Sequence, residues 1–414
     1  MFNWLFQRLR PPTEPAGPRP RDLAVEALRG FCALVVLYVH LFASAYALDP
    51  RYAPSAKFYY FNLGPAAVLV FFVLSGYVIG LTARRPASAV EIRQYARRRL
   101  LRLLPVTYAA LAVTWLLAPV FSGRTVVGHL LFLSNDLPYP WLGLFPLLQT
   151  NPNLWSLTYE AVYYTLFVGL WLWAPRFYLV LGAAALLTVA PALDWPVAPV
   201  FGRLACGSFY WLAGLGIAWL TEECPAAGRR SNWPAALFCA YAIWALGPLR
   251  TWLYDCHFDS FLWLTAASPH RLDFLPVCLW LLLAVTGRAP RAQVWLTIGC
   301  LAWASLGWGR AWLNAELKPI DFLAGGALGL ALAIAGWKPS LAWFSKLAPV
   351  GTISFGLYVL GGPIQLAFRT FVPVFSGTAY TYAIRVAVAL ALIATAAWLV
   401  ERKFQPWIAA RFRR

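Results

Sequence analysis

The sequence predicts an all-α fold, a polytopic bundle of ten to twelve transmembrane helices. Of the 414 residues, 61% are hydrophobic and only 12% are charged, and the mean hydropathy is +0.63. Apolar runs of roughly 17–25 residues, long enough to cross a hydrocarbon core of about 30 Å, recur along the chain. Because a soluble fold could not bury so much apolar surface, we expect the chain to lie in a lipid bilayer.

The expected spans follow one another with short connections and no internal repeat. They lie near residues 24–46, 64–83, 103–121, 153–174, 177–193, 203–220, 232–249, 273–287, 292–312, 320–337, 347–371 and 380–400. Residues 126–152 are rich in Pro, Trp and Leu and too broken for a regular crossing. We expect this stretch to be re-entrant or to lie in the membrane interface.

The basic residues indicate the orientation. They gather in the N-terminal tail, in residues 84–102, at Arg229–Arg230, at Arg288 and Arg291, and after Arg402. By the positive-inside rule both termini should be cytoplasmic. The expected membrane is a bacterial inner membrane. The expected organisation is a tail over 1–23, a membrane domain over 24–402 and a second tail over 403–414.

The net charge of +18 does not indicate a nucleic-acid partner, because the arginines flank apolar runs and form no single basic face. The seven cysteines are scattered, with no CxxC pair and no histidine at ligand spacing. Neither a metal site nor a disulfide framework is therefore expected.

The first span carries the most informative polar residues. A charged side chain at the centre of a membrane helix costs about 2.5–3.5 kcal/mol, so Glu26, Arg29 and His40 need a reason. Eleven residues of α-helix return to within about 20° of the same azimuth, which puts Arg29 and His40 on one face, about 16 Å apart. Glu26 lies one turn before Arg29 and can neutralise it. This face should line a protein cavity, where His40 could act as a general base; the alternative is a hydrogen-bonded packing histidine.

Arg99 and Arg102 lie three residues apart, and so on one helix face, as the third span begins. Guanidinium pairs suit phosphate capture, which would fit a nucleotide-bearing donor arriving from the cytoplasm; positive-inside topology explains the cluster equally well. In the second span, Ser75 and Gly76 read most simply as a close helix contact.

The fourth span opens with a polar and aromatic face. Trp155 and Tyr159 are four residues apart, as are Ser156 and Glu160. An interfacial aromatic belt explains the rings but not the intramembrane carboxylate. Glu160 could orient His40 or bind sugar hydroxyls.

These segments together resemble the type-3 family of integral membrane acyltransferases. The motifs are Glu-Ala-Leu-Arg-Gly at 26–30, FFVLSGYVI at 71–79, RRLLRLLP at 98–105, LWSLTYE at 154–160, ISFGLYVLGGPI at 353–364 and Val400-Glu401. They occur in the family's order over almost the whole chain. The resemblance implies transfer of an acyl group, often acetyl, from acyl-CoA to a hydroxyl of a carbohydrate such as a surface or exported polysaccharide.

The resemblance also implies roles for residues. His40 takes the catalytic base, Arg29 its partner, Arg99 and Arg102 the donor-binding pair, and Glu160 a required acidic position. Supporting positions are Glu26, Ser75, Gly76, Trp155, Ser156, Tyr159 and Tyr358. The chain departs from the family at Gly361, where members commonly carry a histidine. Acetyl-CoA or another acyl-CoA is expected as the donor substrate, with no tightly bound cofactor and no metal.

Two other functions fit a buried Arg, His and Glu. A transporter or flippase would show repeated halves with broken helices, and none is apparent. A polytopic glycosyltransferase would, by resemblance, carry acidic residues in its first outer loop, where residues 47–63 offer only Asp49. The sequence leaves open the acceptor, the acyl length, the oligomeric state, and the choice between direct transfer and an acyl-histidine intermediate.

Overall fold

The structure is a computed structural model of the chain. The described residues are 22–43, 48–52, 54–55, 62–83, 86–117, 122–134, 145–148, 150–190, 199–221, 230–256, 268–313, 331 and 335–412. In this part every regular element is a helix, and the backbone bridge between Arg230 and Ser340 is isolated. The expectation of an all-α fold is confirmed.

Helices lie at most of the expected spans. Their bounds are α1 Leu23–Tyr38, α2 Gly64–Thr82, α3 Ala89–Leu117, α5 Trp155–Trp173, α6 Phe177–Val189, α7 Pro199–Leu220, α8 Trp233–Leu246, α10 Leu275–Thr286, α11 Pro290–Leu313, α15 Ser354–Phe371 and α16 Ala379–Leu399. Among the described residues, five stretches are long and apolar enough to cross a bilayer: Leu23–Phe42, Gly64–Thr82, Ala89–Leu117, Pro269–Thr286 and Ala379–Arg411. Their length and composition are those of membrane-spanning helices.

Shorter elements connect the long helices. They are α4 Gly123–Leu130, α9 Pro248–Asp255, α13 Leu341–Ser345, α14 Ala348–Gly351 and α17 Gln405–Arg411, with π segments at Val39–Ala43 (η2) and Val400–Phe404 (η9). Two 3₁₀-helices lie at Pro152–Leu154 (η5) and Pro269–Phe274 (η8). The expected span at 320–337 lies largely outside the described residues.

Helix α3 differs from its expected bounds. It begins at Ala89, well before residue 103, and keeps Pro105 inside the helix. The arginine-rich stretch therefore belongs to the same helix as the expected span, whose start the sequence placed near residue 103. The physical reason is that Arg, Gln, Ala and Leu are all good helix formers, so a high charge does not break a helix.

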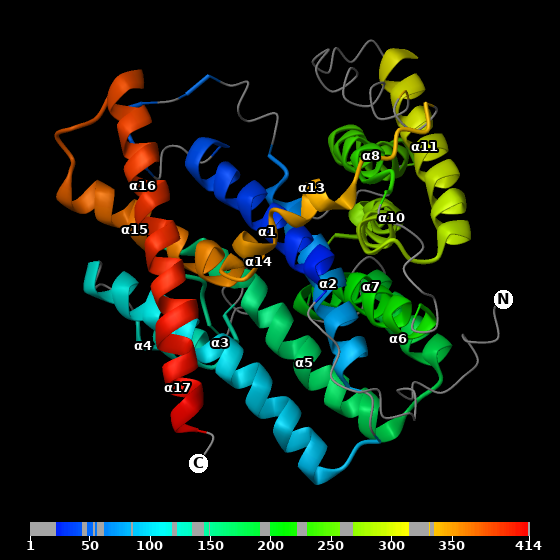
Figure 1. The fold of residues 1–414 in the computed structure, drawn as a ribbon, viewed down its shortest axis with the longest axis horizontal. Coiled ribbons are helices and arrows are strands. Elements are labelled where there is room, and N and C mark those ends of the chain that lie inside the picture. Colours follow the sequence, from blue (N-terminus) through cyan, green and yellow to red (C-terminus); the bar gives the residue numbers. More distant parts are fainter. Residues whose placement is uncertain are drawn as a thin grey trace. The chain divides into compact units, whose positions relative to one another are not determined.

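The chain forms two compact units, and the helices are drawn in Figure 1. The first comprises Met1–Leu28, Val68–Pro86 and Gly169–Ala348. The second comprises Arg29–Ala67, Ala87–Val168 and Pro349–Arg414. Most of the residues singled out by sequence belong to the second unit.

In the first unit, glycines let α2 and α7 approach each other closely. A Cβ at Gly76 would fall on the backbone carbonyl of Trp211, and one at Gly214 would fall on that of Val73. A Cβ at Gly80 would lie 2.6 Å from the Cβ of Ala218. Reciprocal contacts between small residues are typical of helix pairs in membranes, so Gly76 is a packing residue of this contact.

We expect Gly76→Ala to destabilise the first unit by about 1–3 kcal/mol, because the added methyl group must push the two backbones apart. Gly182→Ala is the matched control, since Gly182 lies in α6 with no neighbouring atom within 4 Å of its Cβ position. The midpoint of thermal unfolding in detergent measures both effects. Equal midpoints for the two variants would show that the α2–α7 contact is not tight.

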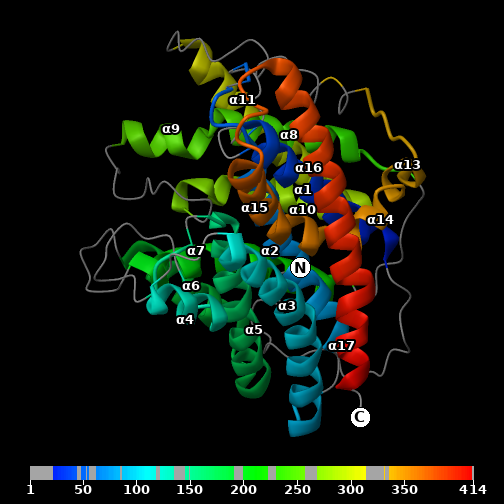
Figure 2. The same ribbon diagram turned by 90° about the vertical axis from the view of Figure 1, so that its left-hand side faces the viewer.

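In the second unit, α15 packs against both α16 and α3. Figure 2 shows α16 continuing through η9 into α17, which runs beside α3. Near the N-terminus of α15, the backbone N–H of Gly356 donates to Oε1 of Glu401 at 2.5 Å. A carboxylate at a helix N-terminus is stabilised by the helix dipole, so Glu401 fastens the end of α16 to the start of α15.

Candidate active site

The two units divide the candidate site residues unequally. The second unit contains Arg29, His40, Arg99, Arg102, Trp155, Ser156, Tyr159, Glu160 and Tyr358. The first contains Glu26, Ser75 and Gly76. Most of the candidate site therefore lies in the second unit.

His40 lies in a π segment that follows α1. Helix α1 ends at Tyr38, and residues Val39–Ala43 form a π-helix. A π turn takes in one more residue than an α turn, so His40 is rotated from the position that an uninterrupted α-helix would give. The shared face of Arg29 and His40 thus stays a prediction, while the π turn itself is a feature frequent at functional sites.

Side chains from other helices hold the π segment in place. The amide of Gln365, in α15, donates to the carbonyl of His40 at 2.9 Å. The hydroxyl of Tyr382, in α16, donates to the carbonyl of Leu41. These bonds fix the backbone at His40 while leaving its partly buried imidazole without a hydrogen-bond partner among the described residues.

His129 shows what a structural histidine looks like in this chain. Its Nδ1 lies 2.8 Å from the carbonyl of Thr125, and its Nε2 accepts the N–H of Leu148 at 3.3 Å. Burial lowers the pKa of His129, partly offset by the bond to Thr125. A neutral imidazole with both nitrogens engaged cannot serve as a base, so His40 is the better candidate of the two.

The start of α5 is joined to α15 by a network of hydrogen bonds. The hydroxyl of Tyr358 donates to the carbonyl of Asn153 at 2.6 Å and lies 2.9 Å from the hydroxyl of Ser156. Nδ2 of Asn151 donates to the carbonyl of Val359 at 3.1 Å. The structure thus brings together Ser156 and Tyr358, two supporting residues that are 202 positions apart.

A second network links Arg99 with Glu160. The guanidinium of Arg99 lies over the rings of Tyr95 and Tyr164, 5.4 Å and 5.1 Å from their centroids. The hydroxyl of Tyr164 donates to Oε1 of Glu160. The carboxylate is therefore held by Tyr164, and the pairing of Glu160 with His40 stays a prediction.

Arg99 keeps donor capacity beyond these contacts. Its Nε is buried and has no hydrogen-bond partner among the described residues. Trp155 and Tyr159 pack with perpendicular rings whose centroids are 5.2 Å apart, and Arg102 is partly buried one turn beyond Arg99. The buried Nε of Arg99 is a guanidinium donor that suits an anionic ligand.

The contact between α15 and the start of α5 contains two adjacent glycines with different surroundings. A Cβ at Gly362 would lie 2.6 Å from Oδ1 of Asn151, whereas a Cβ at Gly361 would meet no atom of the described residues within 4 Å. Oδ1 of Asn151 is buried without a hydrogen-bond partner among the described residues. Among the described residues, Gly361 therefore has room for a side chain where Gly362 has none.

We expect Gly362→Ala to lower activity and stability together, because the methyl group displaces Asn151 and weakens its bond to Val359; the cost should be about 1–3 kcal/mol. Gly361→Ala is the matched control and should leave the unfolding midpoint unchanged or slightly raised. Thermal unfolding and acyl-transfer assays on both variants check this. A larger loss in the Gly361 variant would contradict the arrangement.

Sequence reasoning missed Arg385, whose side chain is 1% exposed. Its Nε donates to the carbonyl of Phe375 and its Nη1 to that of Leu48, both at 2.6 Å, and its Nη2 donates to the carbonyl of Val372. A lone arginine within the apolar run 380–400 was the signal that could have found it. Arg385 ties the segment after α1 to the connection between α15 and α16.

The sequence is similar to known proteins. A family profile described as an acyltransferase domain matches residues 22–307, which is 286 of the 414 residues. Acyltransferase MdmB of Streptomyces mycarofaciens is 30% identical over 150 residues, covering 35% of this chain and 38% of that protein. The similarity thus spans well under half of this relative. No solved structure matches the chain.

Proposed function

Since the chain belongs to the type-3 acyltransferase family, we propose that it is an O-acyltransferase that moves an acetyl group from acetyl-CoA to a carbohydrate hydroxyl. The observation that carries the proposal is His40: an intramembrane histidine whose backbone is held by Gln365 and whose imidazole is unengaged among the described residues.

The chemistry needs one base that accepts and returns a proton. His40 takes the proton of the acceptor hydroxyl while the hydroxyl oxygen forms a bond to the thioester carbonyl carbon. The carbon–sulfur bond then breaks, and the CoA thiolate takes the proton from the imidazolium. An imidazole suits both steps because its ordinary pKa lies near neutrality.

We propose that Arg99 and Arg102 bind the phosphates of the acyl-CoA donor. Arg99 carries a buried Nε without a partner among the described residues, and Arg102 follows it by one turn on the N-terminal half of α3. Guanidinium groups bind phosphate oxygens through two parallel N–H bonds. The spacing of a regular α-helix would put Arg29 about 16 Å from His40 along the axis, so it would serve the anionic part of the donor and not the reacting carbon.

We propose that the carbohydrate acceptor binds between the start of α5 and α15. Oδ1 of Asn151 is a buried acceptor with no partner among the described residues, and Gly361 leaves open space on the neighbouring helix. A sugar hydroxyl could donate to this oxygen, and the rings of Trp155 and Tyr159 offer an apolar wall. Glu160, held by Tyr164, completes the polar side of this region.

The proposal includes the setting of the enzyme. The protein would reside in a bacterial inner membrane with ten to twelve spans, both termini in the cytoplasm, taking cytoplasmic acetyl-CoA as a substrate without a tightly bound cofactor. The acceptor would be a surface or exported polysaccharide.

The test is mass spectrometry of surface glycans from cells with and without the gene. We expect glycans from expressing cells to carry an added acetyl mass, and the purified protein in vesicles to transfer labelled acetyl from acetyl-CoA to those glycans. Loss of glycan export with unchanged acetylation would favour the transporter or flippase instead.

A further inference from the structure

A groove in the second unit lies on a face of α3 that the proposed chemistry does not use. It has a volume of about 1090 Å³ and lies between α3 and the C-terminal residues Phe404, Ile408 and Phe412. Gln405 holds the two walls together, because its Nε2 donates to the carbonyls of Leu101 and Arg102 at 2.9 Å. Arg99 does not line this groove and lies over Tyr95 and Tyr164.

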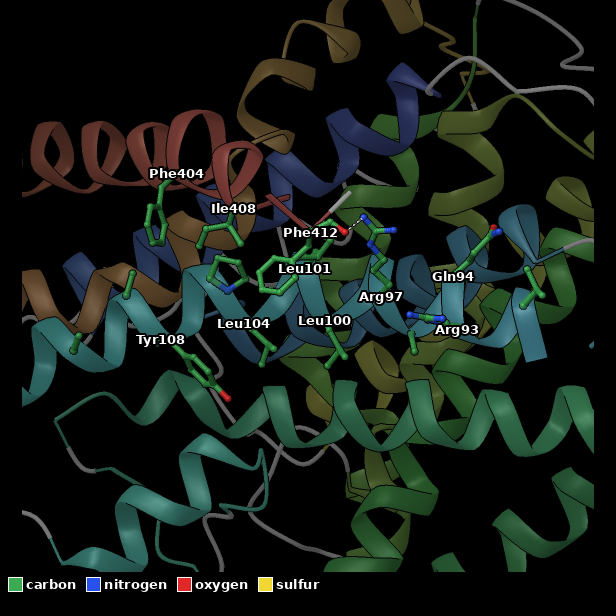
Figure 3. Close-up of a pocket in the computed structure, with 15 residues that line it drawn as sticks. Arg93, Gln94, Arg97, Leu100, Leu101, Leu104, Tyr108, Phe404, Ile408 and Phe412 are labelled. Atoms are coloured by element: carbon green, nitrogen blue, oxygen red, sulfur yellow. Dashed lines mark hydrogen bonds between the residues drawn. The ribbon is translucent and has the colours of Figure 1, made fainter. Parts of the chain in front are cut away.

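One end of the groove is cationic and the rest is apolar. Figure 3 shows Arg93 and Arg97 at one end, with Tyr108 and Phe404 toward the other. Arg93 and Arg97 are both exposed and stand four residues apart on one helix face. Arg97 donates to the carbonyl of Phe412, and its guanidinium has further N–H groups to offer.

The apolar lining continues along α3 from Leu100 to Ala112. Twelve residues of α-helix rise about 18 Å, which is close to half of a hydrocarbon core of about 30 Å. The lining is open to its surroundings: Leu100 is 50% exposed and Phe404 is 41% exposed. The groove is therefore about as long as one leaflet is deep, and its two cations lie at one end.

We propose that this groove binds an anionic phospholipid of the bilayer, with the phosphate on Arg93 and Arg97 and an acyl chain along Leu100, Leu104 and Tyr108. Charge complementarity selects this occupant, since cations beside an apolar helix attract acidic lipids. The chain's own N-terminal segment does not suit the site, because it carries Arg8, Arg10, Arg19 and Arg21 and would be repelled. The proposal is independent of the acyl-transfer reaction.

The test uses the full-length protein purified in detergent. Native mass spectrometry and thermal unfolding are measured with phosphatidylglycerol and with phosphatidylcholine of the same acyl chains. We expect phosphatidylglycerol to be retained and to raise the unfolding midpoint, and phosphatidylcholine to do so far less.

Arg93→Gln combined with Arg97→Gln should weaken phosphatidylglycerol binding about 25-fold, because each cation near acidic lipid is worth about 1 kcal/mol and 1.4 kcal/mol is a factor of ten. Arg98→Gln is the matched control: Arg98 is exposed on the same helix but does not line the groove, so binding should persist. Ala109→Phe keeps both cations and fills the apolar part of the groove, and it should likewise weaken phosphatidylglycerol binding.

Three results would overturn the proposal. The first is equal binding of the two lipids, and the second is an equal loss in the Arg98 and Arg93/Arg97 variants. The third is retention of palmitoyl-CoA, dependent on Arg93 and Arg97, without retention of phosphatidylglycerol, which would make the groove a donor site.

Discussion

His40→Ala is expected to lower the rate of acyl transfer by about 10²- to 10⁴-fold, the range typical for removal of a general base. The imidazole has no hydrogen-bond partner among the described residues, and the bond that involves His40 uses its backbone carbonyl with Gln365. The variant should therefore keep its fold and its affinity for acetyl-CoA. Labelled acetyl transfer by the purified protein measures kcat and KM, and we expect the loss in kcat alone.

Two further variants separate the role of the base from simple packing. Gln365→Leu removes the bond to the carbonyl of His40 and should reduce kcat less than His40→Ala does, because the imidazole remains. His129→Ala should lower the unfolding midpoint, since it breaks the bonds to Thr125 and Leu148, without the specific loss of kcat. Full acyl transfer by His40→Ala would refute the assignment of the base.

Arg385→Met is expected to cause the largest loss of stability, about 3–5 kcal/mol. The substitution keeps much of the volume but leaves the carbonyls of Phe375, Leu48 and Val372 without the donor that they share. Each buried polar group without a partner costs about 1–3 kcal/mol. Fluorescence-detected thermal unfolding in detergent should show a much lower midpoint.

Arg369→Met is the control for this substitution, because Arg369 is an exposed arginine on the adjacent helix α15. Its unfolding midpoint should stay close to that of the unmodified protein. If the two variants unfold at the same temperature, the three carbonyls have other partners and Arg385 does not organise this part of the second unit.

The candidate site was predictable where its signals are local. Arg29 and His40 stand out because charges within an apolar run are costly, and LWSLTYE marks the start of α5 because its polar residues share a helix face. The same rule would have found Arg385, which also interrupts an apolar run. The π turn at His40 had no such signal, because residues Val39–Ala43 read as an ordinary apolar helix.

The partners of these residues could not be predicted in the same way. Glu160 accepts a hydrogen bond from Tyr164, and Arg99 lies over the ring of the same tyrosine, two contacts that the sequence did not indicate. The expected roles of Glu160, to orient His40 or to bind sugar hydroxyls, stay predictions. Asn151 and Val359 are bonded across 208 positions of sequence. The close approach at Gly362, and the open space at Gly361, also depend on how α15 meets the start of α5.

By itself, the sequence determined that this is an all-α integral membrane protein of an acyltransferase family, because the length of apolar runs and the motifs along them are local properties of the chain. Only the tertiary structure decided that Tyr358 is bonded to Ser156, that Arg385 binds three carbonyls, and that α3 shows one face to Tyr164 and another to a groove. The physical reason is that a hydrogen bond depends on a separation of about 3 Å in space, and residues far apart in the sequence reach it only through the packing of whole helices.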